Sequence, residues 1–224
     1  MGWYAAVRFP GESAAYRSAR EELTEAESDL RQQVEQVAEL RRKLPLGGEL
    51  PQDYVFDEGT EVPAKLSDLF REGLDTLAIY DFMFSSAMQQ ACPMCTSFLD
   101  SLNGTAPHAA QRLNLAVVAK SPIARIREFA LGRGWHNLRL LSSAGNTYNR
   151  DYHGETADGQ QVPVMNLFVR RDGKIYHSYS TELVFRTPEP GQNQRHIDMM
   201  WPLWNLLDLT PEGRGADWYP RLTY

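Results

Sequence analysis

Cysteine, basic charge and long hydrophobic runs are all scarce in this sequence. Only two cysteines occur among 224 residues, and in a reducing compartment so few thiols are usually inert and buried. The 23 basic and 29 acidic residues give a formal net charge of −6, which leaves no basic excess for binding nucleic acid. No window approaches about 18 consecutive apolar residues, so no membrane-spanning helix and no membrane partner are expected.

The composition is otherwise that of an ordinary globular protein. Hydrophobic residues make up 42% of the chain and charged residues 23%, which is enough for a real hydrophobic core. The first residues, Met1 to Arg8, contain neither the charged start nor the apolar block of a secretory leader. We therefore expect a cytoplasmic protein.

Residues 12–44 have the pattern of one long helix. Apolar residues from Ala19 to Leu44 recur at intervals of three and four, and Pro45 ends the pattern. Such a helix would be roughly 50 Å long, which is more than one small core can cover. We therefore expect residues 1–45 to form a helical arm that joins copies of the chain through residues 12–44. A clasp around the chain's own domain is the alternative.

Residues 46–210 alternate between strand-length and helix-length apolar segments. Runs such as 76–84 are nearly continuous, which is typical of strands buried on both faces. This order predicts one α/β domain with a mixed sheet, followed by a tail at 211–224. The aromatic residues near the C-terminus are expected to pack internally or to form a dimer contact; they are Trp201, Trp204, Trp218, Tyr219 and Tyr224. The predicted strands are 76–84, 113–119, 138–141, 164–170 and 174–181, and the last predicted helix is 194–207.

The two cysteines stand in the sequence Cys92-Pro93-Met94-Cys95, between a buried strand and the first turn of a helix. Free backbone N–H groups and the helix dipole stabilise a thiolate there, and can lower a thiol pKa from about 8.5 into the range of about 3.5–7.5. We therefore expect Cys92, nearer the helix start, to be the nucleophile and Cys95 to be the resolving thiol. Pro93 and Met94 are the expected contacts to substrate.

Other interpretations of the pair remain open. A Cys-x-x-Cys pair is also half of a zinc site, but the sequence has no second pair and its five histidines lack the His-x₃-His spacing. His177 could face the cysteines and complete a Cu(I) site, although a histidine on a strand is more often a surface residue. The thiols could also be bystanders. Redox chemistry without a metal or a cofactor is the prediction.

Two segments resemble thioredoxins. The strand that starts at Pro163 resembles one whose proline has a cis peptide bond and lies against the cysteine pair, although the residues alone favour trans. The run Ile79-Tyr80-Asp81-Phe82 resembles the strand with a buried aspartate, which implies that Asp81 passes a proton to Cys95. Asp81 stands eleven residues before Cys92, a longer separation than in thioredoxins, so a capping or loop-tethering role is the alternative.

Residues 115–122 and the helix after them resemble the peroxiredoxin branch of the thioredoxin fold. That branch has a proline and a threonine before its peroxidatic cysteine. Ser85 and Gln89 occupy these two positions here, so no peroxide pocket is expected.

The polar segment 142–161 is long enough to be functional or mobile. It leads into Pro163, and the thioredoxin-like arrangement would place it beside the cysteine pair. Tyr148, Tyr152 and His153 are therefore expected to cover a bound thiol compound or peptide, and a plain solvent loop is the alternative. His177, on the later hairpin, is a further expected contact to substrate.

Taken as a whole, the chain resembles a bacterial family described as domain of unknown function 899 and as predicted dithiol-disulfide oxidoreductases. The resemblance implies a thioredoxin-like α/β/α sandwich of the peroxiredoxin branch. It also implies a thiol–disulfide oxidoreductase that acts on a small thiol or disulfide or on a protein disulfide. A non-catalytic thioredoxin-like binding module, or a copper or zinc thiol site, is the alternative. The matching segments are 40–45, 53–56, 80–84, 92–95, 175–180 and 207–211.

Overall fold

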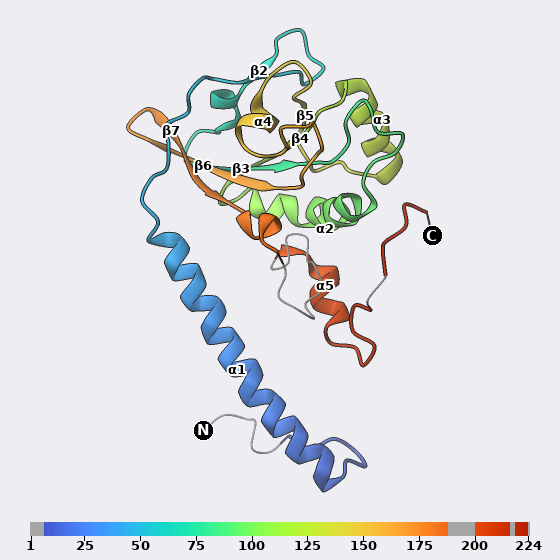
Figure 1. Cartoon of the computed structure of the whole chain (residues 1–224). Helices are drawn as coiled ribbons and strands as arrows, with labels where there is room; N and C mark the ends of the chain where they lie inside the picture. Colours follow the sequence, from blue (N-terminus) through green and yellow to red (C-terminus); the bar gives the residue numbers. More distant parts are fainter. Residues whose placement is uncertain (1–6, 188–199, 216–217, 224) are drawn as a thin grey trace. The chain divides into compact units, whose positions relative to one another are not determined.

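The structure is a computed structural model that describes residues 7–187, 200–215 and 218–223 (Figure 1). The chain divides into two compact units, Met1–Pro45 and Leu46–Tyr224. The first unit contains helix α1 (Ala14–Arg42), two residues shorter at each end than the pattern predicts. Its first turn is capped by the Ser13 hydroxyl, which accepts a hydrogen bond from the Tyr16 N–H.

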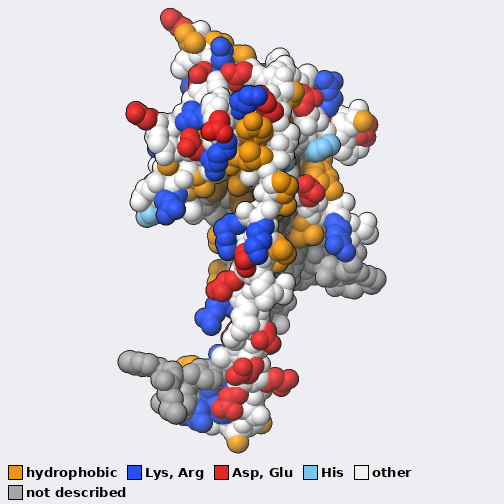
Figure 2. Space-filling model, turned by 90° about the vertical axis from the view of Figure 1, so that its left-hand side faces the viewer, with side chains coloured by type: hydrophobic (Ala, Val, Ile, Leu, Met, Phe, Trp, Pro, Cys, Tyr) orange, Lys and Arg blue, Asp and Glu red, His pale blue; other side chains and the backbone are white. Residues whose placement is uncertain are grey.

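Helix α1 leaves its apolar side chains largely exposed. Leu30 and Leu40 are 63% and 64% exposed, and Leu23 is exposed as well. Arg17 is the one buried residue of the helix, and it forms an ion pair with Glu12. Figure 2 shows charged side chains of both signs along this helix.

We propose that a second copy of the chain covers these leucines. Light scattering of the full-length protein should then give a mass of at least two chains, because three exposed leucines on one helix favour association. Replacing Leu23, Leu30 and Leu40 together by glutamine should lower that mass to one chain. Leu209→Gln, which changes an even more exposed leucine in the second unit, is the control and should leave the mass unchanged. A monomeric wild type at micromolar concentration would contradict the proposal.

The second unit is built on a five-stranded mixed sheet with the strand order β5-β4-β3-β6-β7. Strands β3, β4 and β5 are parallel, whereas β6 pairs with β3 antiparallel and continues into β7. A short hairpin of β1 and β2 forms a separate two-stranded sheet. The strands are β1 (Val55–Phe56), β2 (Ala64–Lys65), β3 (Thr76–Asp81), β4 (Asn114–Ala119), β5 (Leu140–Ser142), β6 (Met165–Arg171) and β7 (Lys174–Ser180).

Helices cover the sheet and connect its parallel strands. Helix α2 joins β3 to β4, and α3 joins β4 to β5, which are the crossovers that parallel strands require. Figure 1 shows α2 on one side of the sheet and α4 on the other. The elements are α2 (Pro93–Ala109), α3 (Ile123–Arg133), α4 (Tyr148–Asp151) and α5 (Pro202–Leu207), with 3-10 turns η2 (Leu66–Leu69) and η3 (Glu182–Phe185).

Strand β3 separates two hydrophobic cores because its side chains alternate between the faces of the sheet. Ala78 and Tyr80 belong to the core on the α2 side. Leu77 and Ile79 belong to the core that includes the β1–β2 hairpin and α4. Asp81, the next residue after Tyr80, therefore faces away from α2, and this alternation decides which groups can meet the cysteines.

This topology is the thioredoxin-like fold of the peroxiredoxin branch, which confirms the expected fold class. The fold is defined by the parallel β3-α2-β4 unit and the antiparallel β6–β7 hairpin. Edge strand β5 lies between these two units in the sequence. None of the helices in the described ranges is long and apolar enough to cross a membrane.

Several boundaries differ from the expectations. Strand β3 ends at Asp81 rather than at residue 84, and segment 142–161 contains the short helix α4. Helix α5 begins at Pro202, and residues 194–199 of the predicted last helix lie outside the described residues. The described residues from 211 onward are grouped with the rest of the second unit.

Candidate active site

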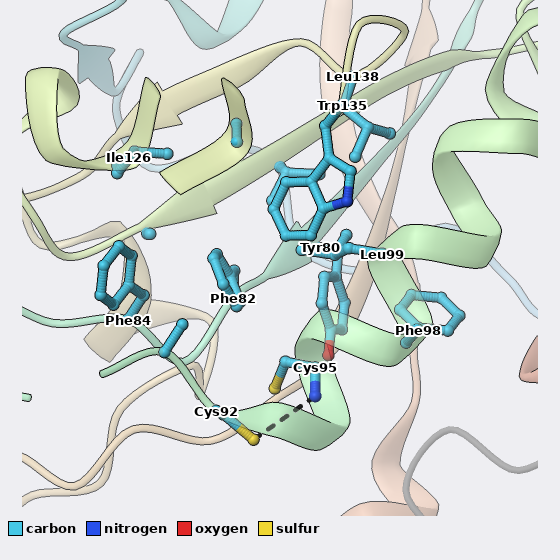
Figure 3. Close-up of a cluster of buried hydrophobic side chains, with 14 of the residues drawn as sticks. Tyr80, Phe82, Phe84, Cys92, Cys95, Phe98, Leu99, Ile126, Trp135 and Leu138 are labelled. Carbon is cyan, nitrogen blue, oxygen red and sulfur yellow. Dashed lines mark hydrogen bonds between the residues drawn. The ribbon is translucent and has the colours of Figure 1, made fainter. Parts of the chain in front are cut away.

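Cys92 and Cys95 lie at the start of α2, and both are free thiols (Figure 3). Cys92 is the N-cap residue, and its Sγ accepts a hydrogen bond from the Cys95 N–H at 3.5 Å. Pro93 opens the helix, where its missing N–H costs no intrahelical hydrogen bond. The Cys92 N–H donates to the Met83 carbonyl at 3.1 Å, which fixes the approach to the helix.

The surroundings of the two thiols make them chemically unequal. The hydrogen bond with the Cys95 side chain, aided by the Cys95 N–H, the Tyr219 hydroxyl and the Met94 N–H, lowers the pKa of Cys92 to about 6 although burial opposes it. Burial and the nearby Cys92 sulfur raise the pKa of Cys95 well above its usual value. At neutral pH the negative charge therefore resides on Cys92 and the proton on Cys95, as nucleophile and resolving thiol require.

Two tyrosines contact the pair, one at each sulfur. Tyr80 is fully buried on β3, and its hydroxyl points toward Cys95 and hydrogen-bonds to it, which lowers the pKa of that thiol against the effect of burial (Figure 3). Tyr219 comes from the C-terminal segment, residues 218–223, and its hydroxyl lies 3.6 Å from Cys92 Sγ. Sequence reasoning missed both roles. Period-two alternation along β3 could have found Tyr80, because it faces the same side as Ala78.

Asp81 is not brought together with the cysteines. It is 1% exposed on the opposite face of β3, where the Asn149 amide donates to its Oδ1 at 2.8 Å and the Asn166 amide to its Oδ2 at 3.2 Å. Burial raises the pKa of this carboxyl well above its usual value. Asn149 belongs to segment 142–161, so the contacts support the loop-tethering role and not proton transfer to Cys95.

The hydrogen bonds around Asp81 extend into that loop. The Ser143 hydroxyl donates to the side chain of Asn149, and Asn166 also donates to the Tyr152 carbonyl at 3.1 Å. Gly154 completes the packing, because a Cβ at this position would lie 2.5 Å from Asp81 Oδ1. Asp81 is thus the point at which the loop is fastened to the sheet.

Pro163 lies just before β6, and its peptide bond is trans, as the residues alone favour, and not cis, as the resemblance to thioredoxins implies. No cis peptide bond occurs in the described part of the chain. The Val164 carbonyl accepts a hydrogen bond from the Asp81 N–H, which places Pro163 one residue beyond this pairing, near the end of β3.

Tyr148, Tyr152 and His177 lie on the other face of the sheet from the cysteines. Tyr152 packs edge-on against Phe168, with 4.9 Å between ring centroids, and Tyr148 is buried in the same core. His177 packs against Tyr152, and its Nε2 lies 3.3 Å from the Asn166 side-chain oxygen. Tyr152 and His177 line a cavity of about 1090 Å³ whose lining includes neither cysteine. The loop's attachment to Asp81 explains why it does not cover the dithiol.

The described residues contain no group of three or more histidine, cysteine, aspartate or glutamate side chains placed to hold a metal ion. His177 in particular does not join Cys92 and Cys95. The polar groups next to the pair are tyrosine hydroxyls and backbone N–H groups, which stabilise a thiolate, within a largely hydrophobic core.

Comparison with solved structures finds similarity at low identity to several proteins, including the following three. Peroxiredoxin Q from Xanthomonas campestris, in a mutant form, is 14% identical, with 60% of this chain and 84% of that chain covered and a TM-score of 0.46. Peroxidoxin BcpB from Mycobacterium tuberculosis is 22% identical, with 62% and 87% covered and a TM-score of 0.43. A peroxiredoxin-like protein from Aquifex aeolicus is 14% identical, with 73% and 88% covered and a TM-score of 0.43.

No protein with a curated description matches the chain. The model of one bacterial family matches residues 7–224, which is nearly the whole sequence and includes the dithiol, the loop fastened to Asp81 and the C-terminal segment. The chain belongs to DUF899, a family of bacterial proteins of unknown function.

Proposed function

We propose that the protein is a thiol–disulfide oxidoreductase whose redox-active groups are Cys92 and Cys95. The observation that carries this proposal is the unequal pair at the start of α2. Cys92 has a pKa lowered to about 6 and Cys95 is fully buried with a raised pKa. A low-pKa thiol three residues from a protonated one is what two-step disulfide exchange uses.

The exchange begins with the Cys92 thiolate attacking one sulfur of a substrate disulfide. A bond forms between Cys92 Sγ and that sulfur, the substrate S–S bond breaks, and the other substrate sulfur leaves as a thiolate. Cys95 then loses its proton to solvent or to the departing thiolate and attacks Cys92 Sγ. The mixed disulfide breaks and releases the second substrate thiolate. The substrate gains two electrons, and the protein ends with a Cys92–Cys95 disulfide.

The reverse sequence returns the protein to its dithiol form. A low-molecular-weight thiol or a dithiol protein supplies the two electrons, and becomes a disulfide itself. The direction of net reaction depends on the reduction potential of Cys92–Cys95 relative to that partner.

Two rival functions make different demands on the site. A non-catalytic binding module needs an exposed surface but no acidic thiol, whereas the hydrogen bonds at Cys92 act specifically on its charged form. A metal thiol site needs further ligands, and none of the described histidines or carboxylates joins the pair in a group of three.

Oxidation of the purified protein tests the proposal. Mild oxidation with diamide should remove two thiols per chain together, and dithiothreitol should restore both, because the second thiol closes onto the first. Peptide mapping should show Cys92 joined to Cys95. Two cysteines that are modified independently would contradict the proposal.

The pH dependence of Cys92 reactivity is a second expected result. Iodoacetamide reacts with the thiolate, so the rate should rise with pH and reach half its plateau near pH 6 instead of near 8.5. Mass spectrometry should show the label on Cys92 and not on Cys95. A half-plateau at pH 8 or above would show that the hydrogen bonds do not stabilise the thiolate.

A further inference from the structure

The C-terminal segment, residues 218–223, extends to the nucleophilic sulfur. The Tyr219 hydroxyl lies 3.6 Å from Cys92 Sγ. Tyr219 is 52% exposed whereas Cys92 is only 8% exposed, so the side chain that contacts the buried sulfur itself reaches solvent. The two residues are 127 positions apart, and the contact exists only because the segment returns to α2.

The segment is fastened on both sides of Tyr219. On one side, Arg133 Nη1 donates to the Leu222 carbonyl at 2.7 Å, while the same guanidinium forms an ion pair with Asp100 of α2. On the other side, the Trp218 ring packs edge-on against buried Trp204, with 5.8 Å between centroids. These attachments hold Tyr219 at Cys92 without a covalent link.

Burial and the hydrogen bond with Cys92 raise the pKa of Tyr219 above its usual value. The hydroxyl therefore keeps its proton throughout the pH range in which Cys92 ionises. A protonated hydroxyl beside a thiolate can only donate, so the contact stabilises the charged form of Cys92.

We infer that Tyr219 is a positioning residue for Cys92, and that the C-terminal segment is a gate that admits low-molecular-weight disulfides more readily than disulfides of folded proteins. This inference rests on the proposed function. A substrate sulfur has to reach Cys92 Sγ, and access is one of the factors that set the rate of disulfide exchange. A small disulfide needs only a side-chain movement of Tyr219, whereas a protein surface needs displacement of the whole segment.

Alkylation of the full-length protein by iodoacetamide separates the two parts of the inference. In Tyr219→Phe the hydroxyl is lost but the ring remains, so the pH of half-plateau should rise by several tenths of a unit or more while the plateau rate stays unchanged. In Tyr219→Ala the half-plateau should shift in the same direction, and the plateau rate should also rise severalfold because the sulfur is uncovered. Tyr176→Phe on β7 is the matched control and should change neither.

Substrate size is tested with oxidised glutathione and with insulin. Tyr219→Ala should raise the rate with insulin several times more than the rate with oxidised glutathione. If the alanine variant does not fold, Arg133→Lys, which removes the Nη1 hydrogen bond to the Leu222 carbonyl, should shift the same ratio in the same direction.

An unchanged half-plateau in Tyr219→Phe together with an unchanged rate ratio would overturn the inference. Alkylation does not require turnover, so the two proposals can fail separately. A shifted half-plateau in a protein that reduces neither disulfide would overturn the proposed function and leave Tyr219 as the positioning residue. Normal disulfide exchange together with no effect of the Tyr219 substitutions would overturn the inference about Tyr219 and leave the proposed function standing.

Discussion

Replacing Cys92 by serine should lower the rate of disulfide reduction by on the order of a thousandfold or more, to the rate without protein. Serine has the shape of cysteine but supplies no anion at neutral pH, so neither the mixed disulfide nor any later step can form. The measurement is the reduction of insulin, or of oxidised glutathione if the gate excludes insulin, with dithiothreitol as the electron source.

Cys95→Ser should stop the reaction at a different point. Cys92 still attacks, but no resolving thiol is present, so a mixed disulfide with the substrate should accumulate to about one per chain. Intact-mass spectrometry detects the added substrate mass. Ser101→Ala, later on α2, is the control and should retain the wild-type rate. Equal residual activity in the two cysteine variants would contradict the division of roles and favour the non-catalytic binding module.

The position of the dithiol could be predicted because its determinants are local. An apolar run that becomes β3 precedes the pair, Pro93 has the fixed φ of a first helical residue, and helical spacing follows. The long helix could be predicted for the same reason, since a regular apolar pattern followed by Pro45 locates it to within two residues at each end. The confirmed fold class follows from the order of such segments.

The partners of the dithiol could not be predicted in the same way. A run that is apolar on both faces conceals which side each residue occupies, so Asp81 was assigned to the face that Tyr80 in fact occupies. Tyr219 meets Cys92 across 127 positions, and no local pattern records such a contact. The loop 142–161 was placed by its closeness in sequence to Pro163, whereas its hydrogen bonds to Asp81 hold it on the opposite face.

The second large effect is expected at Asp81, and it concerns stability. Asp81→Ala should lower the free energy of unfolding by about 2–5 kcal/mol, because the buried Asn149 amide loses its acceptor and the Asn166 amide keeps only the Tyr152 carbonyl. Urea unfolding followed by circular dichroism measures this change. A loss under about 0.5 kcal/mol, the size of an ordinary surface substitution, would show that Asp81 does not fasten the loop.

Asp81→Asn tests the ionisation of the same group. Burial raises the pKa of Asp81 in the folded protein above its unfolded value of about 4, so the folded state binds the proton more tightly. Its contribution to stability is therefore complete below pH 4 and is lost as the pH rises toward the folded pKa. Ionisation of Cys92 changes the free energy of unfolding in the opposite direction, because its folded pKa is lowered. This effect begins only above about pH 6, where Cys92 ionises in the folded protein.

Between pH 4 and pH 6, the effect of Asp81 on the free energy of unfolding can therefore be measured without a contribution from Cys92. Other carboxyls contribute equally to both proteins, so the informative quantity is the unfolding free energy of the wild type minus that of Asp81→Asn. This difference should fall by up to about 1.4 kcal/mol for each pH unit, because one extra proton is bound by the folded wild type. Parallel curves across this window would mean that Asp81 ionises in the folded protein as readily as in the unfolded chain. The two amide hydrogen bonds would then offset its burial completely.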